Sequence, residues 1–352
     1  MRTVKIVGLV ALLAAFIVFP QVFPNPAVTT VAVFTLLYAT STTAWNIFSG
    51  YTGYIALGHA AYFGIGAYSI ALMCQDWHIP AGYAPFLVIP IAGLTAAAFA
   101  LPLGWISLRT RKHTFVVITI AVFFIMQLMA FNLRDITKGS TGLSLPIPSE
   151  WRSDFFNLPF YYLALVMLVV ALGVSWWIRN SKYGLGLLAI RDDEDRALGL
   201  GVNTGPSKLI AFVISAFFVG MAGALHAYFI GSIFPAFAFD PLFDVALALM
   251  TFLGGLGTLS GPILGALILE PAQQYFTLQF SQHGYNLIIY GILFLVIILL
   301  LPEGIVPTLD KYRLKWLASR GSTNDPAAHP DTTSQSEPVL AESGGSKKGV
   351  DL

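Results

Sequence analysis

Long apolar runs dominate this sequence and limit the folds open to it. Runs of about 18 or more weakly charged residues recur as far as about residue 302. An α-helix of that length crosses a hydrocarbon layer of about 30 Å. Of the 352 residues, 56% are hydrophobic and only 11% are charged, so a water-soluble fold could not bury this much apolar surface. The sequence therefore predicts an all-α polytopic membrane protein.

The apolar runs predict ten transmembrane helices with both chain ends in the cytoplasm. The helices are expected at about 4–22, 27–48, 53–74, 83–106, 113–132, 159–178, 207–230, 243–259, 262–280 and 285–302. The first is interpreted as an uncleaved helix, because no small-x-small cleavage site follows it. In this arrangement only Arg134, Lys138 and Arg152, of 19 Lys and Arg residues, lie outside. That bias agrees with the positive-inside rule.

Two domains are predicted, a transmembrane domain over 1–306 and a cytoplasmic segment over 307–352. The second begins beside the membrane and ends in a tail without aromatic residues, which we expect to be disordered. An outside loop over about 133–158 could dock a partner or simply connect two helices. A net charge of +1 argues against a nucleic-acid partner. The lone Cys74 excludes an intramolecular disulfide and a cysteine-based metal site.

A polar segment over about 179–206 separates two of the predicted helices. Its residues 191–196 are all ionisable, and each charge would cost about 2.5–3.5 kcal/mol in the middle of a membrane. The segment must therefore lie in water. It has an apolar and a charged side, as expected of a helix that lies on a membrane or docks into a groove of another protein. A solvated connector is the alternative, although a length of roughly 28 residues is unusual for one.

Glycine-rich stretches interrupt two predicted helices, one in each half of the chain. Residues 50–68 contain five glycines, and residues 253–265 contain five more with Pro262. Each glycine costs a helix about 1 kcal/mol relative to alanine. The stretches are interpreted as broken helices that line a substrate path, or as sites of close helix packing. Their placement suggests a repeated-halves transporter, although the internal match does not establish a duplication.

Several polar residues fall inside the predicted helices. They are Asn46, His59, Gln127, His226, Glu270 and Gln273. An intramembrane carboxylate such as Glu270 is a functional candidate, or it is protonated or serves packing alone. His59 is interpreted as an interhelical histidine or, less often, a ligand. The chain has no metal-ligand spacing of histidines, no Ser/His/Asp arrangement and no phosphate-binding loop, so neither enzyme chemistry nor nucleotide hydrolysis by this chain is supported.

Four motifs together resemble the LivM-type permeases of branched-chain amino acid ABC importers. They are Gly50–Tyr68, Gly184–Glu194, Leu253–Pro262 and Leu301–Ile305, and their order and spacing match over about residues 30–306. The chain departs from the family at Asp192–Asp195, which is denser in acidic residues. It also departs at Glu270-Pro271, where relatives more often have Pro-Glu, which puts a role for Glu270 in doubt.

The resemblance implies a transport subunit, not an enzyme, in a bacterial inner membrane. Its partners would be a LivH-type permease, two LivG/LivF-type ATPase subunits and a periplasmic substrate-binding protein. ATP and Mg would be bound by the ATPases, with no cofactor or metal in this chain. The solute would be a branched-chain or other amino acid. The alternatives are urea or a short amide carried by the same family, a proton-coupled secondary transporter and a passive channel.

The resemblance also implies roles for individual residues. The ATPase-coupling residues would be Gly184, Arg191, Asp192, Asp193, Glu194, Arg196 and Ala197. The translocation path would include Asn46, Gly53, Gly58, His59, Gly64, Gly66, Gly254, Gly255, Gly257 and Glu270. Gly139 and Gly142 of the outside loop would face the binding protein. Closure of the ATPases would pull on the coupling segment, and the helices with glycine breaks would switch the path between outward and inward openings.

Overall fold

A computed structural model describes residues 14–148, 156–280, 291–292, 295 and 304–312. The chain divides into two units, 1–310 and 311–352, and only Lys311 and Tyr312 of the second are described. The predicted helix over 285–302, the start of the first helix and the predicted disordered tail therefore lie mostly outside the described residues. The predicted boundary at 306/307 stays a prediction.

The first unit is built from long helices. They are α2 (Pro26–Trp45), which continues into the π-helix η1 (Asn46–Gly50), α3 (His59–Asp76), α4 (Ala84–Ser107), α5 (Lys112–Asn132), α7 (Asn157–Arg179), α10 (Thr204–Ile230), α12 (Pro241–Gly254) and α13 (Gly261–Phe280). Residues 14–22 are also helical. Among the described residues, six segments are long and apolar enough to cross a membrane. The chain is thus an α-helical, multi-pass membrane protein, while the count of ten helices stays a prediction.

Short elements lie between the long helices. They are α6 (Arg134–Thr137), η2 (Gly139–Thr141), β1 (Leu143–Ser144), α8 (Lys182–Asp192), α9 (Glu194–Gly199), β2 (Ser232–Ile233) and α11 (Pro235–Ala238). The two strands pair antiparallel, with Leu143 opposite Ile233.

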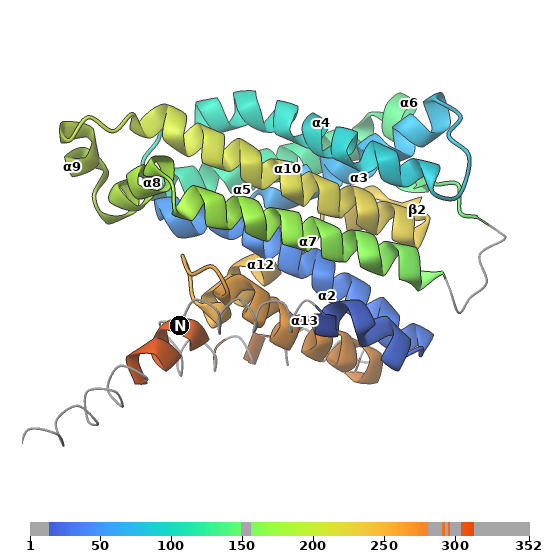
Figure 1. Ribbon diagram of the computed structural model, residues 1–352. Helices are drawn as coiled ribbons and strands as arrows, with labels where there is room; N and C mark the ends of the chain where they lie inside the picture. Colours follow the sequence, from blue (N-terminus) through green and yellow to red (C-terminus); the bar gives the residue numbers. More distant parts are fainter. Residues whose placement is uncertain (1–13, 149–155, 281–290, 293–294, 296–303, 313–352) are drawn as a thin grey trace, which may run out of the picture. The chain divides into compact units, whose positions relative to one another are not determined.

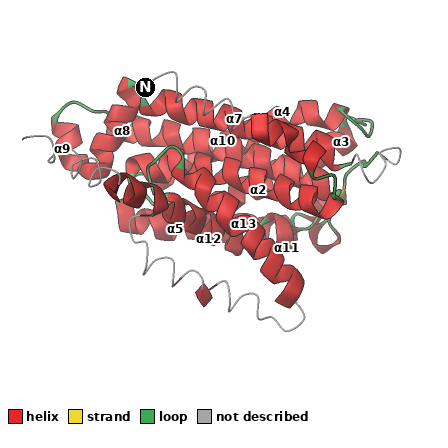
Figure 2. Ribbon diagram, turned by 60° about the horizontal axis from the view of Figure 1, so that its bottom comes forward, coloured by secondary structure: helices red, strands yellow, loops and turns green. Residues whose placement is uncertain are grey.

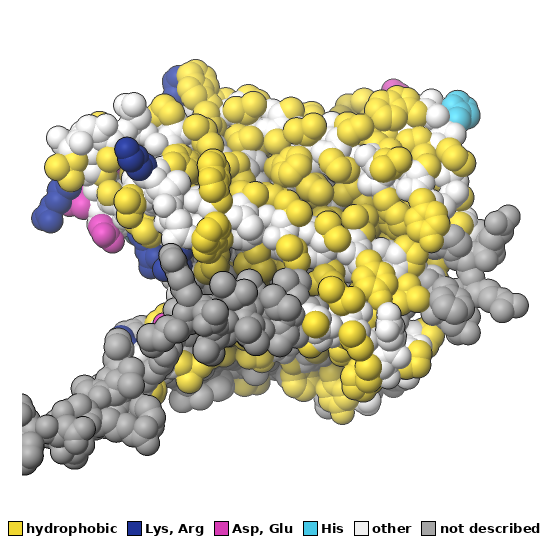
Figure 3. Space-filling model, viewed as in Figure 1, with side chains coloured by type: hydrophobic (Ala, Val, Ile, Leu, Met, Phe, Trp, Pro, Cys, Tyr) yellow, Lys and Arg dark blue, Asp and Glu magenta, His cyan; other side chains and the backbone are white. Residues whose placement is uncertain are grey.

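The short elements gather at opposite ends of the long helices. Figure 1 shows α8 and α9 at one end, and α6 and β2 at the other. A second view shows the long helices running alongside one another between these ends (Figure 2). In Figure 3 most charged side chains in view lie at the α8–α9 end, while apolar side chains cover the flank. Large apolar residues on the outer surface include Leu87, 80% exposed, and Val117, 65% exposed. A flank of this kind suits contact with lipid.

Small residues bring α3 and α10 into close contact at the centre of the unit. A Cβ atom on Gly66 would lie 2.0 Å from the carbonyl oxygen of Gly220, and one on Gly223 would lie 2.0 Å from that of Phe63. A Cβ on Gly64 would lie 2.5 Å from the ring of Phe239. Side chains larger than hydrogen do not fit at these positions, so the glycines permit the close helix packing seen in membrane bundles.

The helix predicted over 53–74 begins instead at His59. Gly53 has φ +72°, and residues 53–58 are non-helical, with Tyr54, Ala56 and Gly58 buried. Side chains form hydrogen bonds with the backbone groups that are not paired within a helix here. The Ala56 carbonyl accepts a hydrogen bond from Trp45 Nε1 at 2.8 Å, and the Leu57 amide donates to Thr119 Oγ1 at 3.2 Å. Irregular backbone of this kind is tolerated at membrane depth where protein surrounds it.

The helix predicted over 243–259 lies instead at Pro241–Gly254. It begins earlier because Asp240 Oδ1 accepts a hydrogen bond from the Leu242 amide at 2.9 Å and caps the helix. It ends earlier because Gly255 has φ +122° and Gly257 has φ +76°, a backbone that cannot continue a right-handed helix.

Candidate functional site

The predicted coupling segment, residues 179–206 and called the coupling segment below, contains the two short helices α8 and α9, and each has a side-chain cap at its start. Ser181 Oγ accepts a hydrogen bond from the Gly184 amide at the start of α8. Asp193 separates α8 from α9, and its Oδ1 accepts from the amides of Asp195 and Arg196 at 3.0 and 3.1 Å. Asp193 is therefore the N-cap of α9, a position for which aspartate is strongly preferred. One predicted coupling residue thus has a local structural task.

The apolar side of the coupling segment packs against the long helices. Leu187, Ile190 and Ala197 are at most 1% exposed. Gly184 is also buried, and a Cβ there would lie 2.0 Å from the carbonyl oxygen of Ile178 in α7. Gly184 and Ala197 therefore face the bundle, and neither presents a side chain to a partner.

The opposite side of the segment is open to water. Asp192, Asp195 and Arg196 are exposed, and Leu198 and Leu200 are 55% and 83% exposed. A groove of about 420 Å³ runs between Asp192, Arg196 and Leu200. A surface with charged residues around exposed leucines is suited to a protein partner.

Glu194 turns away from this surface and pairs with a buried lysine. Lys208 Nζ in α10 lies 2.5 Å from Glu194 Oε1, and the Lys208 side chain is 4% exposed. Lys208 also donates to the Tyr54 hydroxyl at 3.2 Å, which in turn donates to Glu194 Oε2. Burial opposes the charge on Glu194, but the hydrogen bonds from Lys208 and Tyr54 outweigh it and lower the pKa of the Glu194 carboxyl.

Arg191 also points into the bundle. Its Nη1 donates a hydrogen bond to the Gly50 carbonyl at 2.9 Å. Lys112 Nζ donates to the Arg191 carbonyl at 3.1 Å, which ties the start of α5 to the end of α8. Two residues predicted to contact an ATPase, Arg191 and Glu194, thus bind the chain's own backbone and side chains.

The first glycine-rich break brings His59 to the start of α3. His59 is fully buried, and its Nε2 lies 2.7 Å from Ser215 Oγ in α10. This geometry favours the interhelical interpretation of His59. Gly58 lies against α5, where a Cβ would be 2.4 Å from the Thr119 carbonyl oxygen. A role of either residue in a substrate path stays a prediction.

The second glycine-rich stretch, residues 253–265, lies against the first. A Cβ on Gly254 would lie 1.7 Å from the carbonyl oxygen of Gly261, so the chain reverses sharply between α12 and α13. Gly257 lies beside η1, where its amide donates to Asn46 Oδ1 at 2.8 Å. The residues predicted to line a path in the two halves of the chain are therefore in contact.

Glu270 is buried in α13 at 1% exposed. Gln274 Nε2 donates to its Oε1 at 2.9 Å, while Oε2 has no hydrogen-bond partner among the described residues. No basic side chain of the described part of the chain forms an ion pair with it. Its role in the path stays a prediction.

The predicted binding-protein loop is tied down at the far end of the bundle. Gly139 has φ +56° and is buried. Gly142 has φ +70°, and a Cβ there would lie 2.3 Å from the carbonyl oxygen of Ile233 in β2. Both glycines shape the turn before β1, and their predicted partner contact stays a prediction.

Three functional candidates were missed by sequence reasoning. Asp244 in α12 is 3% exposed, and its Oδ1 accepts from the Ala60 amide in the first turn of α3 at 3.1 Å. Its Oδ2 has no partner in the described parts of the chain. Arg179 Nη1 donates to the Gly257 carbonyl at 2.8 Å. Lys208 is the buried partner of Glu194. An acidic residue near a predicted helix start could have marked Asp244, but its contact is 184 residues away in the sequence.

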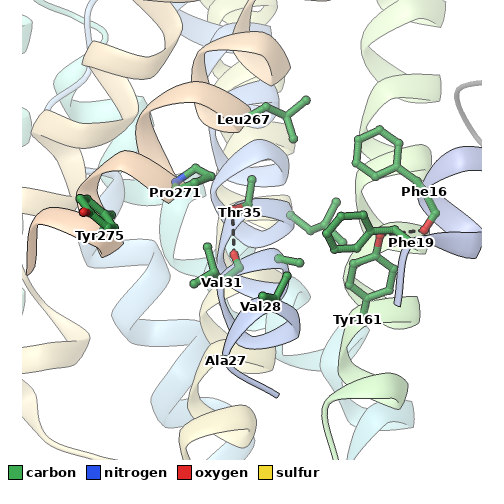
Figure 4. A pocket seen from close by; sticks show the side chains of 12 residues that line it. Phe16, Phe19, Ala27, Val28, Val31, Thr35, Tyr161, Leu267, Pro271 and Tyr275 are labelled. Atoms are coloured by element: carbon green, nitrogen blue, oxygen red, sulfur yellow. Dashed lines mark hydrogen bonds between the residues drawn. The ribbon is translucent and has the colours of Figure 1, made fainter. Parts of the chain in front are cut away.

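An apolar pocket of about 500 Å³ lies between residues 14–22 and helices α2, α7 and α13 (Figure 4). Thr35 in its wall donates to the Val31 carbonyl, and Tyr161 donates to the Phe16 carbonyl, both at 2.7 Å. The described lining offers no charged group to an ammonium or a carboxylate. This pocket is therefore unsuited to a zwitterionic solute. No group of residues that could hold a metal ion occurs in the described part of the chain.

Known proteins are similar to this chain over most of its length. Residues 27–298 match the family model described as branched-chain amino acid transport system / permease component. The high-affinity branched-chain amino acid transport system permease protein LivM of Escherichia coli (strain K12) is 30% identical over 341 residues, which cover 89% of this chain and 78% of that protein. The LivH permease protein of the same strain is 25% identical, over 78% of this chain and 93% of that protein. No solved structure matches.

Proposed function

The chain belongs to the branched-chain amino acid transport system permease family, and from that membership we propose that it translocates branched-chain amino acids as one permease subunit of an ABC importer. Its partners are a LivH-type permease, two LivG/LivF-type ATPases that bind ATP and Mg, and a periplasmic substrate-binding protein. The assembly lies in a bacterial inner membrane, with α8 and α9 on the cytoplasmic side.

The observation that carries this proposal is the two-sided coupling segment. Its outer side exposes Asp192, Arg196 and Leu200. Its inner side is fixed to the bundle through Lys208 and Arg191. A solvated connector would need no buried ion pair, whereas a segment that receives force from a partner must be bonded to the helices that it moves.

The mechanism is a shift between two states of the permease. Nucleotide binding closes the ATPases, and closure favours the state in which α8 and α9 are displaced. Helices that end at the two glycine-rich breaks then change the opening of the path. A ligand shifts such an equilibrium only by its difference in affinity for the two states. ATP supplies this difference in affinity through the ATPases on the cytoplasmic side. The solute-loaded binding protein supplies it on the periplasmic side.

The docking face is tested by site-directed cross-linking. Cys74 is buried, so single cysteines can be placed on its background at Leu200, on the outer side of the segment, or at Ile136, 50% exposed at the opposite end. L200C is expected to capture a nucleotide-hydrolysing subunit, and I136C is expected not to. Labelling of L200C by an impermeant thiol reagent from outside intact cells would show the opposite orientation and reject the proposal.

The assignment of branched-chain amino acids as the solute rests on the family description and on the names of the relatives. Urea or a short amide is the alternative solute class in the same family. Uptake of labelled leucine by proteoliposomes that contain the assembled importer and its binding protein tests the assignment. Uptake of urea with no uptake of leucine would replace it.

A further inference from the structure

Arg191 connects the coupling segment to both glycine-rich breaks. Its Nη1 donates to the Gly50 carbonyl at 2.9 Å. Its Cγ lies 3.0 Å from the position of a Cβ on Gly53, and its Nη1 lies 2.0 Å from that position on Gly257. The side chain therefore fills space that two glycines of separate motifs leave open. These glycines give clearance to an arginine of the coupling segment.

Arg179, at the end of α7, reaches the second break from another side. Its Nη1 donates to the Gly257 carbonyl at 2.8 Å. The carbonyl of Gly50 belongs to the end of a helix, where backbone oxygens carry partial negative charge. Hydrogen bonds from an ionised donor are roughly twice as strong as neutral ones. Two guanidinium groups thus hold the backbone of the two breaks with strong bonds.

Asn46 joins the breaks to each other. Its Nδ2 donates to the Thr258 carbonyl at 2.8 Å, and its Oδ1 accepts from the Gly257 amide at 2.8 Å. Asn46 is 1% exposed, and a Cβ on Gly50 would lie 1.9 Å from its Oδ1. The side-chain amide therefore both donates to and accepts from backbone more than 200 residues away in the sequence.

We propose that Arg179, Arg191 and Asn46 form a clasp that makes the coupling segment and both glycine-rich breaks move as one body. The inference rests on the proposed function, because it takes an ATPase as the source of the movement. Arg191 is a positioning residue, since it acts through the backbone that it holds. When a partner displaces α8, residues 46–53 and 255–260 move with it. The two halves of the chain therefore change state in one step.

The clasp is tested first in the full chain alone, reconstituted in lipid nanodiscs. Hydrogen exchange is measured for R191M and R191K, with R134M as the matched control at the opposite end of the bundle. R191M is expected to accelerate exchange of the Gly257 amide and of amides in 46–53 by at least about tenfold, the effect of losing one hydrogen bond to a charged group. R191K is expected to restore part of the protection, and R134M to change neither region. Acceleration confined to α8, or none, would overturn the inference.

The second test uses the assembled importer. R191M is expected to lower uptake, and the stimulation of ATP hydrolysis by the loaded binding protein, by about tenfold, while the ATPases still co-purify with the permease. G257A keeps Arg191 but places a methyl group in the space that its guanidinium occupies. It is expected to lower uptake and the stimulation of ATP hydrolysis as R191M does. Wild-type coupling in R191M would overturn the clasp. An absence of ATPase binding to the wild-type permease, with the exchange result as expected, would count against the proposed function and support the clasp.

Discussion

Lys208 and Glu194 form an ion pair with 2.5 Å between Nζ and Oε1, at the point where the coupling segment meets α10. The two side chains differ in access to water, because Lys208 is 4% exposed and Glu194 is 23% exposed. The pair fixes α9 to a helix that runs through the centre of the bundle. Its contribution to stability can be separated from any contact with a partner.

Removal of the carboxylate should cost more than removal of the lysine. E194Q leaves the Lys208 ammonium buried without its charge partner, and we expect a loss of about 1.5–3 kcal/mol in the free energy of unfolding. K208M should cost less, because water can still reach Glu194 and methionine fills the apolar space. Denaturant titration of the purified chain measures both. D195N, at an exposed residue whose ion-pair distance is 4.0 Å, is the control and should change stability by less than about 0.5 kcal/mol.

The same pair predicts a pH dependence. The pKa of Glu194 is lowered from 4.5 in the folded chain, so its contribution to stability is fully present above that value and is lost as the pH falls through the lower folded pKa. The stability difference between wild type and E194Q should therefore be constant from neutral pH to about pH 5 and shrink below pH 4.5. A difference that shrinks already between pH 7 and pH 6 would contradict the assignment.

Substitution of Gly66 should separate α3 from α10. A Cβ at this position would meet the Gly220 carbonyl oxygen at 2.0 Å, and overpacking of this kind costs about 1–3 kcal/mol. G66A should lower the unfolding temperature of the detergent-purified chain. The matched control is G173A in α7, where nothing apart from the neighbouring backbone of its own helix lies within 4 Å of the new Cβ. It should be neutral or stabilising by up to about 1 kcal/mol.

Asp244 should act on α3 through its oxygen acceptor. D244N keeps an oxygen that can accept from the Ala60 amide, so its stability should stay close to that of wild type. D244A leaves the amide without its partner and should cost about 1–2 kcal/mol. The unfolding free energies of the two variants decide between these effects. A folded D244N that has lost transport would instead give the carboxylate a role in the transport cycle.

The helical class and the approximate positions of the long helices could be predicted from the sequence. The apolar runs that became α4 and α5 are local signals, because a membrane helix satisfies its backbone within its own segment. That the glycine-rich stretches 50–68 and 253–265 contain breaks could also be predicted, but the exact positions could not, since Gly64 and Gly66 lie inside α3 without breaking it. The predicted start of α3 was wrong by six residues. The side chains of Trp45 and Thr119 form hydrogen bonds with the backbone of 53–58, so this segment does not need to be helical.

The sequence by itself determined that residues 191–196 must leave the lipid, because six consecutive ionisable side chains would each cost about 2.5–3.5 kcal/mol in hydrocarbon. Only the tertiary structure decided which of these charges face outward. Arg191 and Glu194 turn inward to Gly50 and Lys208, while Asp192 and Arg196 stay exposed. The direction of a side chain on a short helix depends on which face packs, and that face is chosen by helices far away in the chain.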